Sequence, residues 1–348
     1  MRAITLLPGV QNSARIDDIP DPPPDDGPIL VRTLALGVCG TDREIIAGLY
    51  GEAPPGAERL VLGHESFGEV IEAPPDSGFA PGDPIVGIVR RPDPVPCPAC
   101  AAGEWDMCRN GRYTERGIKG LNGYGAERFR LEPAFAVKAD AALGILAVLT
   151  EPASIVAKAW DQVERIGKRS PSWKPRQLLV TGSGAIGLLA AMMGRQRGWD
   201  VHILDRGSDG MKSALLRDLG ARHHTGSVAD LTIRPDVIME CTGAPQVVAG
   251  LAGLTTPGGI VCLIGLGGDH AISFDIGRFN RSLVLDNDVM FGSVNANRSH
   301  YDMAADALSR ADRNWLAGLI SRRVPLAQWP EALRRQPDDI KVVIDFTT

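Results

Sequence analysis

The sequence lacks the long basic and long apolar stretches that mark two large classes of protein. Its 348 residues carry 37 Lys and Arg against 42 Asp and Glu, a net charge of −5, with no basic tract. This balance argues against nucleic acid or an anionic membrane as a partner. No apolar run reaches the roughly 20 residues that cross a bilayer, and the first residues lack the apolar core of a signal peptide. We therefore expect a cytoplasmic protein with neither kind of partner.

Cysteine is scarce too, and the spacing of the six cysteines argues against a disulfide framework. A close Cys-x-x-Cys pair in a cytosolic enzyme is more often metal-binding than bridged. Cys97 and Cys100 form such a pair, and Cys108 follows, so these three predict a metal-binding loop. Cys241 and Cys262 lie within apolar, strand-like runs, and we expect them to be small buried hydrophobic residues.

The length of the chain suggests two domains of different character. Up to about residue 150 the sequence is rich in Pro, Gly and short β-like runs such as 29–36 and 84–89, which is typical of an irregular β-rich domain. Residues 151–166 have helical spacing of apolar side chains, and residues 170–175 are typical of a linker.

After this linker the pattern alternates between strands and helices. The expected strands are 177–181, 200–204, 236–240 and 259–264, and the expected helices are 185–197 and 209–219. Such alternation predicts an α/β fold with a parallel sheet covered by helices on both faces. A strand near 283–290 would form the edge of the sheet. A helix near 301–308 follows, and a last strand at 341–346 is expected to return to the first domain.

A glycine-rich turn predicts a dinucleotide site. The turn follows an expected strand, opens an expected helix, and consists of Gly182, Gly184, Ala185, Ile186 and Gly187, with a serine after the first glycine. Its glycines let the backbone approach a pyrophosphate, and the start of the helix supplies free N–H donors. Asp205, at the end of the next strand, would accept hydrogen bonds from the ribose hydroxyls. An ordinary tight turn is the alternative. A dinucleotide site is favoured because the expected strand, the expected helix and the acid all lie at the spacing that the motif requires.

Two adjacent residues bear on the choice between NAD and NADP. The carboxylate of Asp205 repels a 2′-phosphate and so favours NAD. Arg206 follows at once and could pair with that phosphate, which favours NADP. The sequence therefore predicts NAD, with NADP as a second cofactor.

Three side chains from distant segments have the chemistry of zinc ligands. Cys39 follows a strand, His64 follows a short apolar run, and Glu151 opens the helix 151–166. Thiolate, imidazole and carboxylate suit Zn²⁺, and three protein ligands leave one position for substrate. Zinc there would lower the pKa of a substrate hydroxyl, so that an alkoxide forms and passes hydride to nicotinamide. Each residue also has an ordinary explanation, as a buried thiol, a core histidine or a favourable charge at a helix N-terminus, and spacing alone does not prove that the three converge.

The motifs around these residues resemble those of the zinc-dependent medium-chain dehydrogenases and, within that family, the glucose 1-dehydrogenases. The likeness covers nearly the whole chain and is carried by Cys39-Gly40-Thr41-Asp42, Gly48-Leu49-Tyr50-Gly51, Leu60-Val61-Leu62-Gly63-His64-Glu65, Arg90-Arg91-Pro92, Glu115-Arg116-Gly117-Ile118, Gly123-Tyr124, Glu127, Glu151-Pro152 and Gly292-Ser293-Val294-Asn295. The resemblance implies a β-rich, GroES-like catalytic domain made of residues 1–174 and 294–348. It implies a Rossmann domain with a doubly wound parallel sheet at residues 175–293.

The resemblance also implies how the catalytic zinc is held. Cys39, His64 and Glu151 would be its ligands. Glu65 would lie behind them or exchange into the coordination sphere, and Asp42 would orient His64 through its distal nitrogen.

Four further residues gain roles from the same resemblance. Thr41 would pass the substrate proton on through the nicotinamide ribose, and Glu44 would stand at the outer end of that relay. Glu115 and Asn295 would hydrogen-bond sugar hydroxyls. A solvated surface charge is the alternative for Glu44 and Glu115.

The cysteine loop matches three of the four ligands that the family uses for a structural zinc, namely Cys97, Cys100 and Cys108. Pro94 stands where the first cysteine should be. Asp93 is the nearest replacement, with Glu104 and Asp106 as others. Structural zinc requires a closed tetrahedral shell, so either a carboxylate completes the shell or the site is weakened. We expect bound zinc rather than a loop of free thiols.

The resemblance favours oxidation of a sugar hydroxyl, with D-glucose or a close aldose converted at C1 to the lactone. Val89 and Ile155 stand where some relatives carry polar or acidic residues, and their absence removes hydroxyl contacts. A cyclitol, polyol or other secondary alcohol of a specialised pathway is therefore the alternative. A zinc-free reductase and a non-catalytic NAD(P)H-binding protein are disfavoured, because neither needs the residues of the zinc site. Relatives are dimers or tetramers, so we expect a homodimer or homotetramer.

Overall fold

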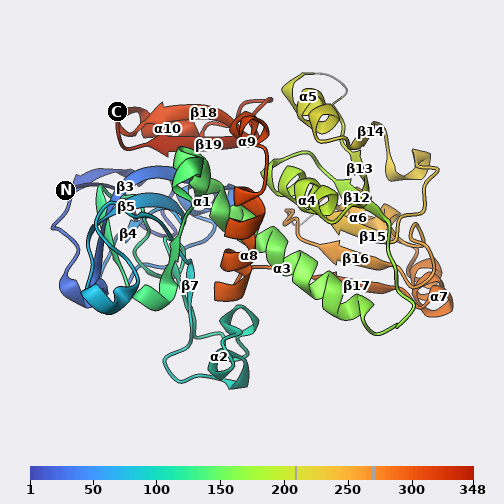
Figure 1. The fold of residues 1–348 in the computed structure, drawn as a ribbon, viewed down its shortest axis with the longest axis horizontal. Coiled ribbons are helices and arrows are strands. Elements are labelled where there is room, and N and C mark those ends of the chain that lie inside the picture. The colour runs from blue at the N-terminus through green and yellow to red at the C-terminus, as the bar shows by residue number, and fades with distance from the viewer. Residues whose placement is uncertain (208–209, 269–270) are drawn as a thin grey trace. The chain divides into compact units, whose positions relative to one another are not determined.

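The computed structural model of the protein describes residues 1–207, 210–268 and 271–348, and the chain divides into two compact units (Figure 1). Unit 1 consists of Met1–Ser154 and Asn295–Thr348, and unit 2 of Ile155–Val294. The first boundary lies inside helix α3 (Thr150–Gly167), 20 residues before the predicted position at 174. Most of this helix belongs with unit 2 because Trp160 packs edge-on against Trp199, with ring centroids 5.0 Å apart.

Unit 1 is built around a seven-stranded sheet. Its strands are β3 (Ile29–Val38), β5 (Glu65–Glu72), β6 (Pro84–Gly87), β10 (Arg128–Leu131), β11 (Ala136–Lys138), β18 (Ile320–Pro325) and β19 (Lys341–Asp345). The order is β11-β6-β5-β3-β19-β18, and β10 also pairs with β3. Strand β19 lies antiparallel to β3 and parallel to β18, so the predicted return of the last strand to the first unit is confirmed.

Two three-stranded sheets and several short helices complete unit 1. The sheets combine β1 (Arg2–Leu6) with β2 (Arg15–Asp18) and β4 (Leu60–Val61), and β7 (Arg90–Arg91) with β8 (Thr114–Arg116) and β9 (Gly120–Leu121). The helices are α1 (Gly40–Ile46), α2 (Pro98–Ala101), α8 (Arg298–Ser309), α9 (Arg313–Leu319) and α10 (Trp329–Leu333). Figure 1 shows α2 on a small lobe that projects beyond β7.

Glycines allow close backbone contact just before His64. A Cβ at Gly117 or Gly123 would collide with the carbonyl oxygen of Gly63, which itself has a φ of +97°. The backbone N–H of Gly123 donates to Val61, and that of Tyr124 donates to Gly63 over 2.9 Å. These contacts fix the chain at the start of strand β5, where His64 and Glu65 lie.

In its described residues, unit 2 contains a six-stranded sheet whose strands are all parallel. The strands are β12 (Gln177–Thr181), β13 (Asp200–Leu204), β14 (Arg222–His224), β15 (Val237–Glu240), β16 (Ile260–Leu263) and β17 (Val289–Gly292), and the helices besides α3 are α4 (Ala185–Gln196), α5 (Met211–Asp218), α6 (Pro245–Gly250) and α7 (Ile276–Asp286). The order β14-β13-β12-β15-β16-β17 is the 3-2-1-4-5-6 order of a Rossmann fold. The predicted doubly wound α/β fold is confirmed.

The predicted edge strand at 283–290 is wrong in most of its length. Residues up to Asp286 belong to helix α7, and Asn287 ends that helix with a left-handed φ of 56°. The edge strand β17 begins only at Val289, because the chain must first turn away from the helix. The start predicted for helix α5, at residue 209, lies outside the described residues.

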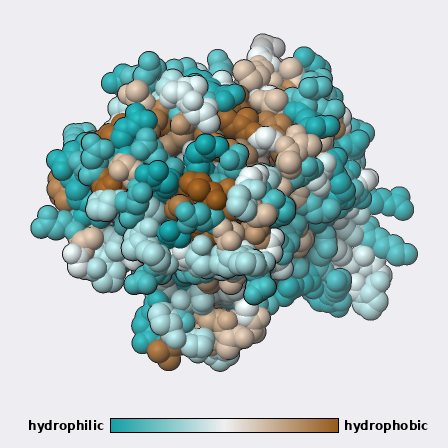
Figure 2. Space-filling view, turned by 60° about the vertical axis from the view of Figure 1, so that its left-hand side comes forward, coloured by the Kyte–Doolittle hydropathy of each residue, from teal (hydrophilic) through white to brown (hydrophobic). Residues whose placement is uncertain are grey.

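One segment is apolar enough to test the expectation about membranes. Ala141–Gly167 is long and apolar enough to cross a bilayer by length and composition, which the sequence pattern did not predict, but 67% of its most apolar window is buried inside the protein. That burial is typical of the core helix of a globular protein. The face in Figure 2 is mostly hydrophilic, with hydrophobic residues in small separate areas.

Candidate metal and dinucleotide sites

The sheet of unit 1 brings Cys39, His64 and Glu65 together. Cys39 follows β3 as the N-cap of α1, and Glu65 opens β5, where it pairs with Gly37 of β3. One ligand atom from each of the three residues lies within 4.8 Å of the others. A Cβ at Gly37 would collide with the carboxylate of Glu65, so only glycine leaves room for that side chain.

Asp42 lies behind His64, in the place predicted for an orienting acid. His64 Nδ1 is 3.3 Å from Asp42 Oδ1, and both side chains are buried. The other oxygen of Asp42 accepts a hydrogen bond of 2.8 Å from the backbone N–H of Cys39, which fixes the carboxylate. Burial lowers the pKa of His64, but Asp42 and Cys39 outweigh it and hold the pKa well above its usual value. A metal ion at this site would have to displace that proton.

Lys341, which the sequence analysis missed, holds Glu65 from the opposite side. Its Nζ lies 2.6 Å from each carboxylate oxygen of Glu65, and both side chains are buried. Burial lowers the pKa of Lys341, but Glu65 outweighs it and raises the pKa above its usual value, so the lysine stays charged. The signal available in the sequence was a single lysine at the start of an otherwise apolar strand.

Glu151 is a second buried acid at this site, in the first turn of α3. Burial raises its pKa to about 7; the charge of Glu65 adds to the rise, while His64 and Lys341 oppose it. The structure thus places two acids near Cys39 and His64, with Glu65 rather than Glu151 in the group whose ligand atoms converge. A thiolate, an imidazole and a carboxylate form a donor set that fits Zn²⁺.

The predicted proton relay begins next to this metal site. The hydroxyl oxygen of Thr41 lies 4.0 Å from the sulfur of Cys39. Glu44, one turn further along α1, is exposed to solvent. The structure therefore places Thr41 at the site and leaves the role of Glu44 as a prediction.

Glu115 and Asn295, predicted to bind sugar hydroxyls, are direct neighbours although 180 positions separate them. Asn295 Nδ2 donates to Glu115 Oε1 over 2.6 Å, and Arg90 donates to the same oxygen over 2.9 and 3.1 Å. Glu115 is 5% exposed, so the alternative of a solvated surface charge is wrong for this residue. Arg90 was noted only as part of a motif; its guanidinium stacks 3.6 Å above the ring of Tyr113.

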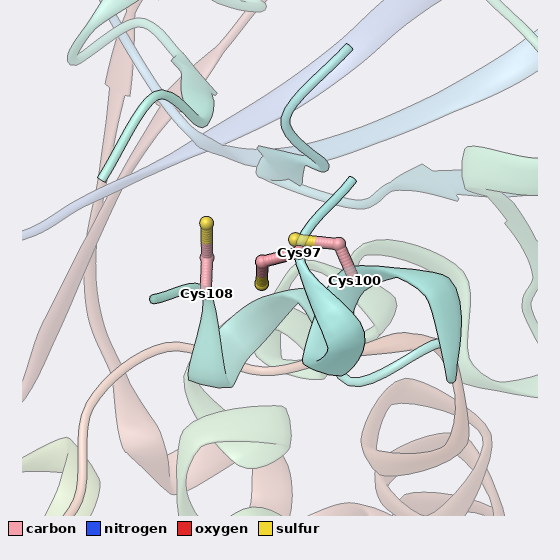
Figure 3. A group of neighbouring side chains, drawn as sticks. All are labelled: Cys97, Cys100 and Cys108. Atoms are coloured by element: carbon pink, nitrogen blue, oxygen red, sulfur yellow. The ribbon is translucent and has the colours of Figure 1, made fainter. Parts of the chain in front are cut away.

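The three cysteines of the loop face one another in the lobe that carries α2 (Figure 3). The sulfurs of Cys97, Cys100 and Cys108 lie within 4.8 Å of one another. Hydrogen bonds from the backbone N–H groups of Arg109 and Cys100 lower the pKa of Cys97 to about 6, as suits a thiolate.

Asp93, predicted as the fourth ligand of this site, has its carboxylate engaged elsewhere in the lobe. Its carboxylate does not lie within the group of sulfurs. It accepts hydrogen bonds from the backbone N–H of Val95 over 2.8 Å, from Asn110 Nδ2 over 2.7 Å and from Arg112 Nε over 3.1 Å. Asp106, an alternative ligand, accepts a hydrogen bond of 2.8 Å from Asn297. Among the described residues no acid or histidine joins the three sulfurs.

In unit 2 the predicted glycine-rich turn lies between β12 and α4. Ala185 and Ile186, the last residues predicted for the turn before Gly187, form the start of α4. Gly182 has a φ of +90°, and a Cβ at Gly187 would collide with the carbonyl oxygen of Gly182. A Cβ at Gly184 would meet no atom within 4 Å, so this side of the turn is open. The turn therefore has the close strand–helix packing and the open backbone that a pyrophosphate site requires.

Asp205 is tied to this turn by a residue that the sequence analysis did not consider. One of its oxygens accepts hydrogen bonds from the backbone N–H of Ser183 over 2.6 Å and from its hydroxyl over 2.5 Å. Burial raises the pKa of Asp205, but the bonds from Ser183 and Gly207 outweigh it, so the pKa lies below its usual value. Asp205 is ionised at neutral pH, and Arg206 beside it is exposed.

A second glycine cluster, also missed, follows the neighbouring strands β15 and β16. A Cβ at Gly265 or Gly267 would collide with the backbone of Gly243, so these two loops touch backbone to backbone. Glu240, fully buried, accepts hydrogen bonds from the backbone N–H groups of Thr242 over 2.7 Å and of Gly243 over 3.0 Å. Ligands of this fold bind at the carboxyl ends of the strands, where these loops lie.

Comparison with known families agrees with both halves of this description. The model of the alcohol dehydrogenase GroES-like domain matches residues 25–141, and that of the glucose dehydrogenase C-terminus matches residues 144–346. The chain belongs to the zinc-dependent glucose dehydrogenase family. Among other members of this family, glucose 1-dehydrogenase 2 of Vulcanisaeta moutnovskia is 39% identical over 351 residues, and glucose 1-dehydrogenase of Methanocella arvoryzae is 39% identical over 360 residues. Each alignment covers 99% of this chain and 99% of the relative.

A solved structure of the glucose dehydrogenase family has the same fold over its full length. It is the Haloferax mediterranei glucose dehydrogenase in complex with NADP, Zn and gluconolactone, which is 32% identical and superimposes with a TM-score of 0.91. The match covers 100% of both chains. The family predicted from the sequence motifs is therefore confirmed.

Proposed function

We propose that this chain oxidises D-glucose, or a close aldose, at C1 to the lactone and transfers the hydride to NAD or NADP with the help of zinc. The observation that carries this proposal is the identity of 39% to glucose 1-dehydrogenases over 99% of both chains. The related Haloferax enzyme, solved with gluconolactone, NADP and Zn, supports the same product and cofactors.

The side chains of unit 1 divide the work of this reaction between them. When bound, zinc would polarise the substrate hydroxyl and ease the loss of its proton. Cys39 and His64 would hold the metal with Glu65 or Glu151, and the hydroxyl of Thr41 lies beside Cys39 to take up the proton.

The pair formed by Glu115 and Asn295 would orient the sugar ring. Arg90 and Asn295 both donate hydrogen bonds to Oε1 of Glu115. Among the described residues, these hydrogen bonds leave the second carboxylate oxygen, Oε2, without a donor. Oε2 would therefore accept a hydrogen bond from a sugar hydroxyl. A fixed acceptor of this kind discriminates strongly against substrates that lack the hydroxyl.

The test is the initial rate of oxidation for a panel of aldoses, cyclitols and simple alcohols, with NAD and NADP in parallel, on protein whose zinc content has been counted. We expect the fastest turnover with glucose or a close epimer. Cys39→Ser and His64→Ala serve as controls, because they should abolish turnover and leave NADPH binding, measured by fluorescence titration, nearly intact.

Absence of turnover with every aldose in zinc-replete protein would refute the proposed substrate. The apolar side chains of Val89 and Ile155 would then direct the search to a cyclitol, polyol or other secondary alcohol. Turnover without zinc would refute the metal-dependent mechanism as well.

We also propose that the protein is a homodimer or homotetramer. Exposed apolar side chains on helix α7 next to the edge strand β17 support this proposal: Ile276, Val284 and Leu285 are each about two-thirds exposed. A cytoplasmic location stays a prediction from the sequence.

A further inference from the structure

Three sulfurs converge in the cysteine lobe, and the described residues add no fourth ligand atom to this group. Cys97 begins α2, Cys100 lies within it, and Cys108 follows the short 3₁₀ helix Trp105–Met107. All three sulfurs lie within 4.8 Å of one another, and among the described residues no carboxylate or imidazole completes the group. A structural zinc site requires four protein ligands in a closed shell, so this lobe does not fit a closed site.

The carboxylate of Asp93 makes hydrogen bonds within the same lobe instead of joining the sulfurs. It is 3% exposed and accepts hydrogen bonds from Val95, Asn110 and Arg112, which joins the start of the lobe to its end. A closed zinc site would cross-link the same two stretches of chain. The carboxylate therefore supplies a connection that a metal ion would otherwise provide.

Further contacts attach the lobe to the rest of unit 1 without any metal. Trp105 packs edge-on against Phe135, with ring centroids 5.5 Å apart. Arg90 Nη1 donates to the carbonyl oxygen of Asp106 over 3.2 Å, and Asn297 donates to the carboxylate of the same residue over 2.8 Å. These three contacts and the bonds to Asp93 hold both ends of the lobe in place.

We propose that the cysteine lobe is an open three-thiolate site, in which a soft metal ion such as Zn²⁺ or Cd²⁺ takes its fourth ligand from solution, and that Asp93 rather than the metal maintains the shape of the lobe. An open position on zinc is the arrangement of a ligand-exchanging site, not of a structural one. Thiolate ligands select soft ions over hard ones. The proposal concerns this lobe alone and does not depend on the substrate of the enzyme.

The experiment uses cobalt as a spectroscopic replacement for zinc in the full-length Cys39→Ser variant. Because this variant lacks the thiolate of the other metal site, sulfur-to-cobalt charge-transfer absorption then comes from the lobe. We expect one cobalt ion with thiolate absorption, and we expect its visible ligand-field bands to shift when azide or a small thiol is added. Bands that do not respond to either ligand would show a closed shell and overturn the proposal.

Asp93→Asn, in the same background, is the matched variant because it keeps the size of the side chain and removes its charge. We expect the cobalt spectrum to keep its bands, because the spectrum reports the donor atoms and Asp93 is not one of them, while the affinity falls by no more than the roughly 10- to 100-fold that an outer partner of a ligand contributes. The metal-free variant should melt at a lower temperature than the metal-free parent. A changed spectrum would identify Asp93 as a ligand and overturn the proposal.

Cys108→Ser is the positive control, because it removes one of the three proposed ligands. It should weaken cobalt binding by at least about tenfold and reduce the charge-transfer absorption. Limited proteolysis of metal-free protein is the second readout for the shape of the lobe. We expect residues 93–112 to stay uncut after chelation, and rapid cleavage there would show that the metal maintains the shape.

Discussion

At the scale of single residues, the buried pair of Glu65 and Lys341 distinguishes the two acids of the candidate metal site. The lysine holds both carboxylate oxygens of Glu65 at 2.6 Å. Glu151, by contrast, lies at the same site with its pKa raised to about 7 by burial. The site therefore offers one acid held by an ammonium group and a second acid whose pKa is raised by burial.

Lys341→Met should destabilise the protein and alter zinc binding. Loss of the ammonium leaves Glu65 buried without a partner, which costs about 3 kcal/mol or more in comparable buried pairs. We expect a lower midpoint in urea unfolding and a changed zinc affinity in a competition titration with a chelating dye. Lys341→Arg keeps the charge and should lose less stability; equal losses in the two variants would mean that packing rather than charge explains the effect.

Asp205→Ala should raise activity with NADP relative to NAD. The carboxylate repels a 2′-phosphate and binds ribose hydroxyls, so its loss should change the ratio of kcat/KM values by roughly tenfold, the effect of about 1.4 kcal/mol. Ser183→Ala is the control, since it removes one hydrogen bond to Asp205 and keeps the charge. An unchanged ratio in Asp205→Ala would remove this residue from the choice of cofactor.

Local motifs predicted the residues that converge at the candidate metal site and the glycine-rich turn, but not the residues that hold them in place. Asp42 was found because it lies three positions from Cys39 within one motif. Lys341 was missed because it meets Glu65 across 276 positions of sequence. Arg90 escaped a role for the same reason, since only the folded sheet brings it to Glu115.

At the scale of secondary structure, alternation of apolar and glycine-rich segments located most strands of unit 2 within one or two residues. The failure at helix α7 has a physical cause. Its apolar residues Val284 and Leu285 are exposed, so the stretch has the composition of a strand without being in the core. Composition alone does not distinguish these two cases.

Strands β13 and β14 carry a histidine pair through which we expect the stability of unit 2 to depend on pH. His202 Nδ1 lies 2.7 Å from His224 Nε2, and His202 Nε2 lies 3.2 Å from both Asp200 and Gln177. Burial lowers the pKa of His224, and the charges of His202, His223 and Arg222 lower it further.

Because the pKa of His224 is lower in the folded state than the usual 6.5, the folded state binds fewer protons than the unfolded state. This contribution to stability is fully present above about pH 6.5 and is lost as the pH falls through the folded value. We expect the melting temperature to be lower at pH 5.5 than at pH 7.5. These two values lie about one unit below and above the ordinary pKa of histidine. His224→Gln should make the profile flatter in this window, and an unchanged slope would assign the pH dependence to other groups.

At the scale of the whole molecule, the division into a zinc-binding β-rich unit and a Rossmann unit was predictable, because the two parts of the sequence have different patterns of strands, helices and turns. The boundary between the units was not, because helix α3 is continuous in sequence and in space while its packing partners change along its length. The sequence of a single helix does not show which parts of the protein its side chains pack against.

The interrupted course of unit 1 has a consequence for the synthesis of the protein. Unit 2 is continuous in sequence, so it can fold while the ribosome is still adding later residues. Strand β3 pairs with β10 along residues 29–32, but the same edge stays unpaired along residues 35–38 until β19 appears. The hydrogen bond between Lys341 and Val38 spans 303 positions. During most of translation the nascent chain therefore exposes half of one edge of an apolar strand, which is a target for chaperones and a hazard for aggregation. The contact between Lys341 and Glu65 likewise forms only after unit 2 has been synthesised, so the surroundings of the metal site are completed last.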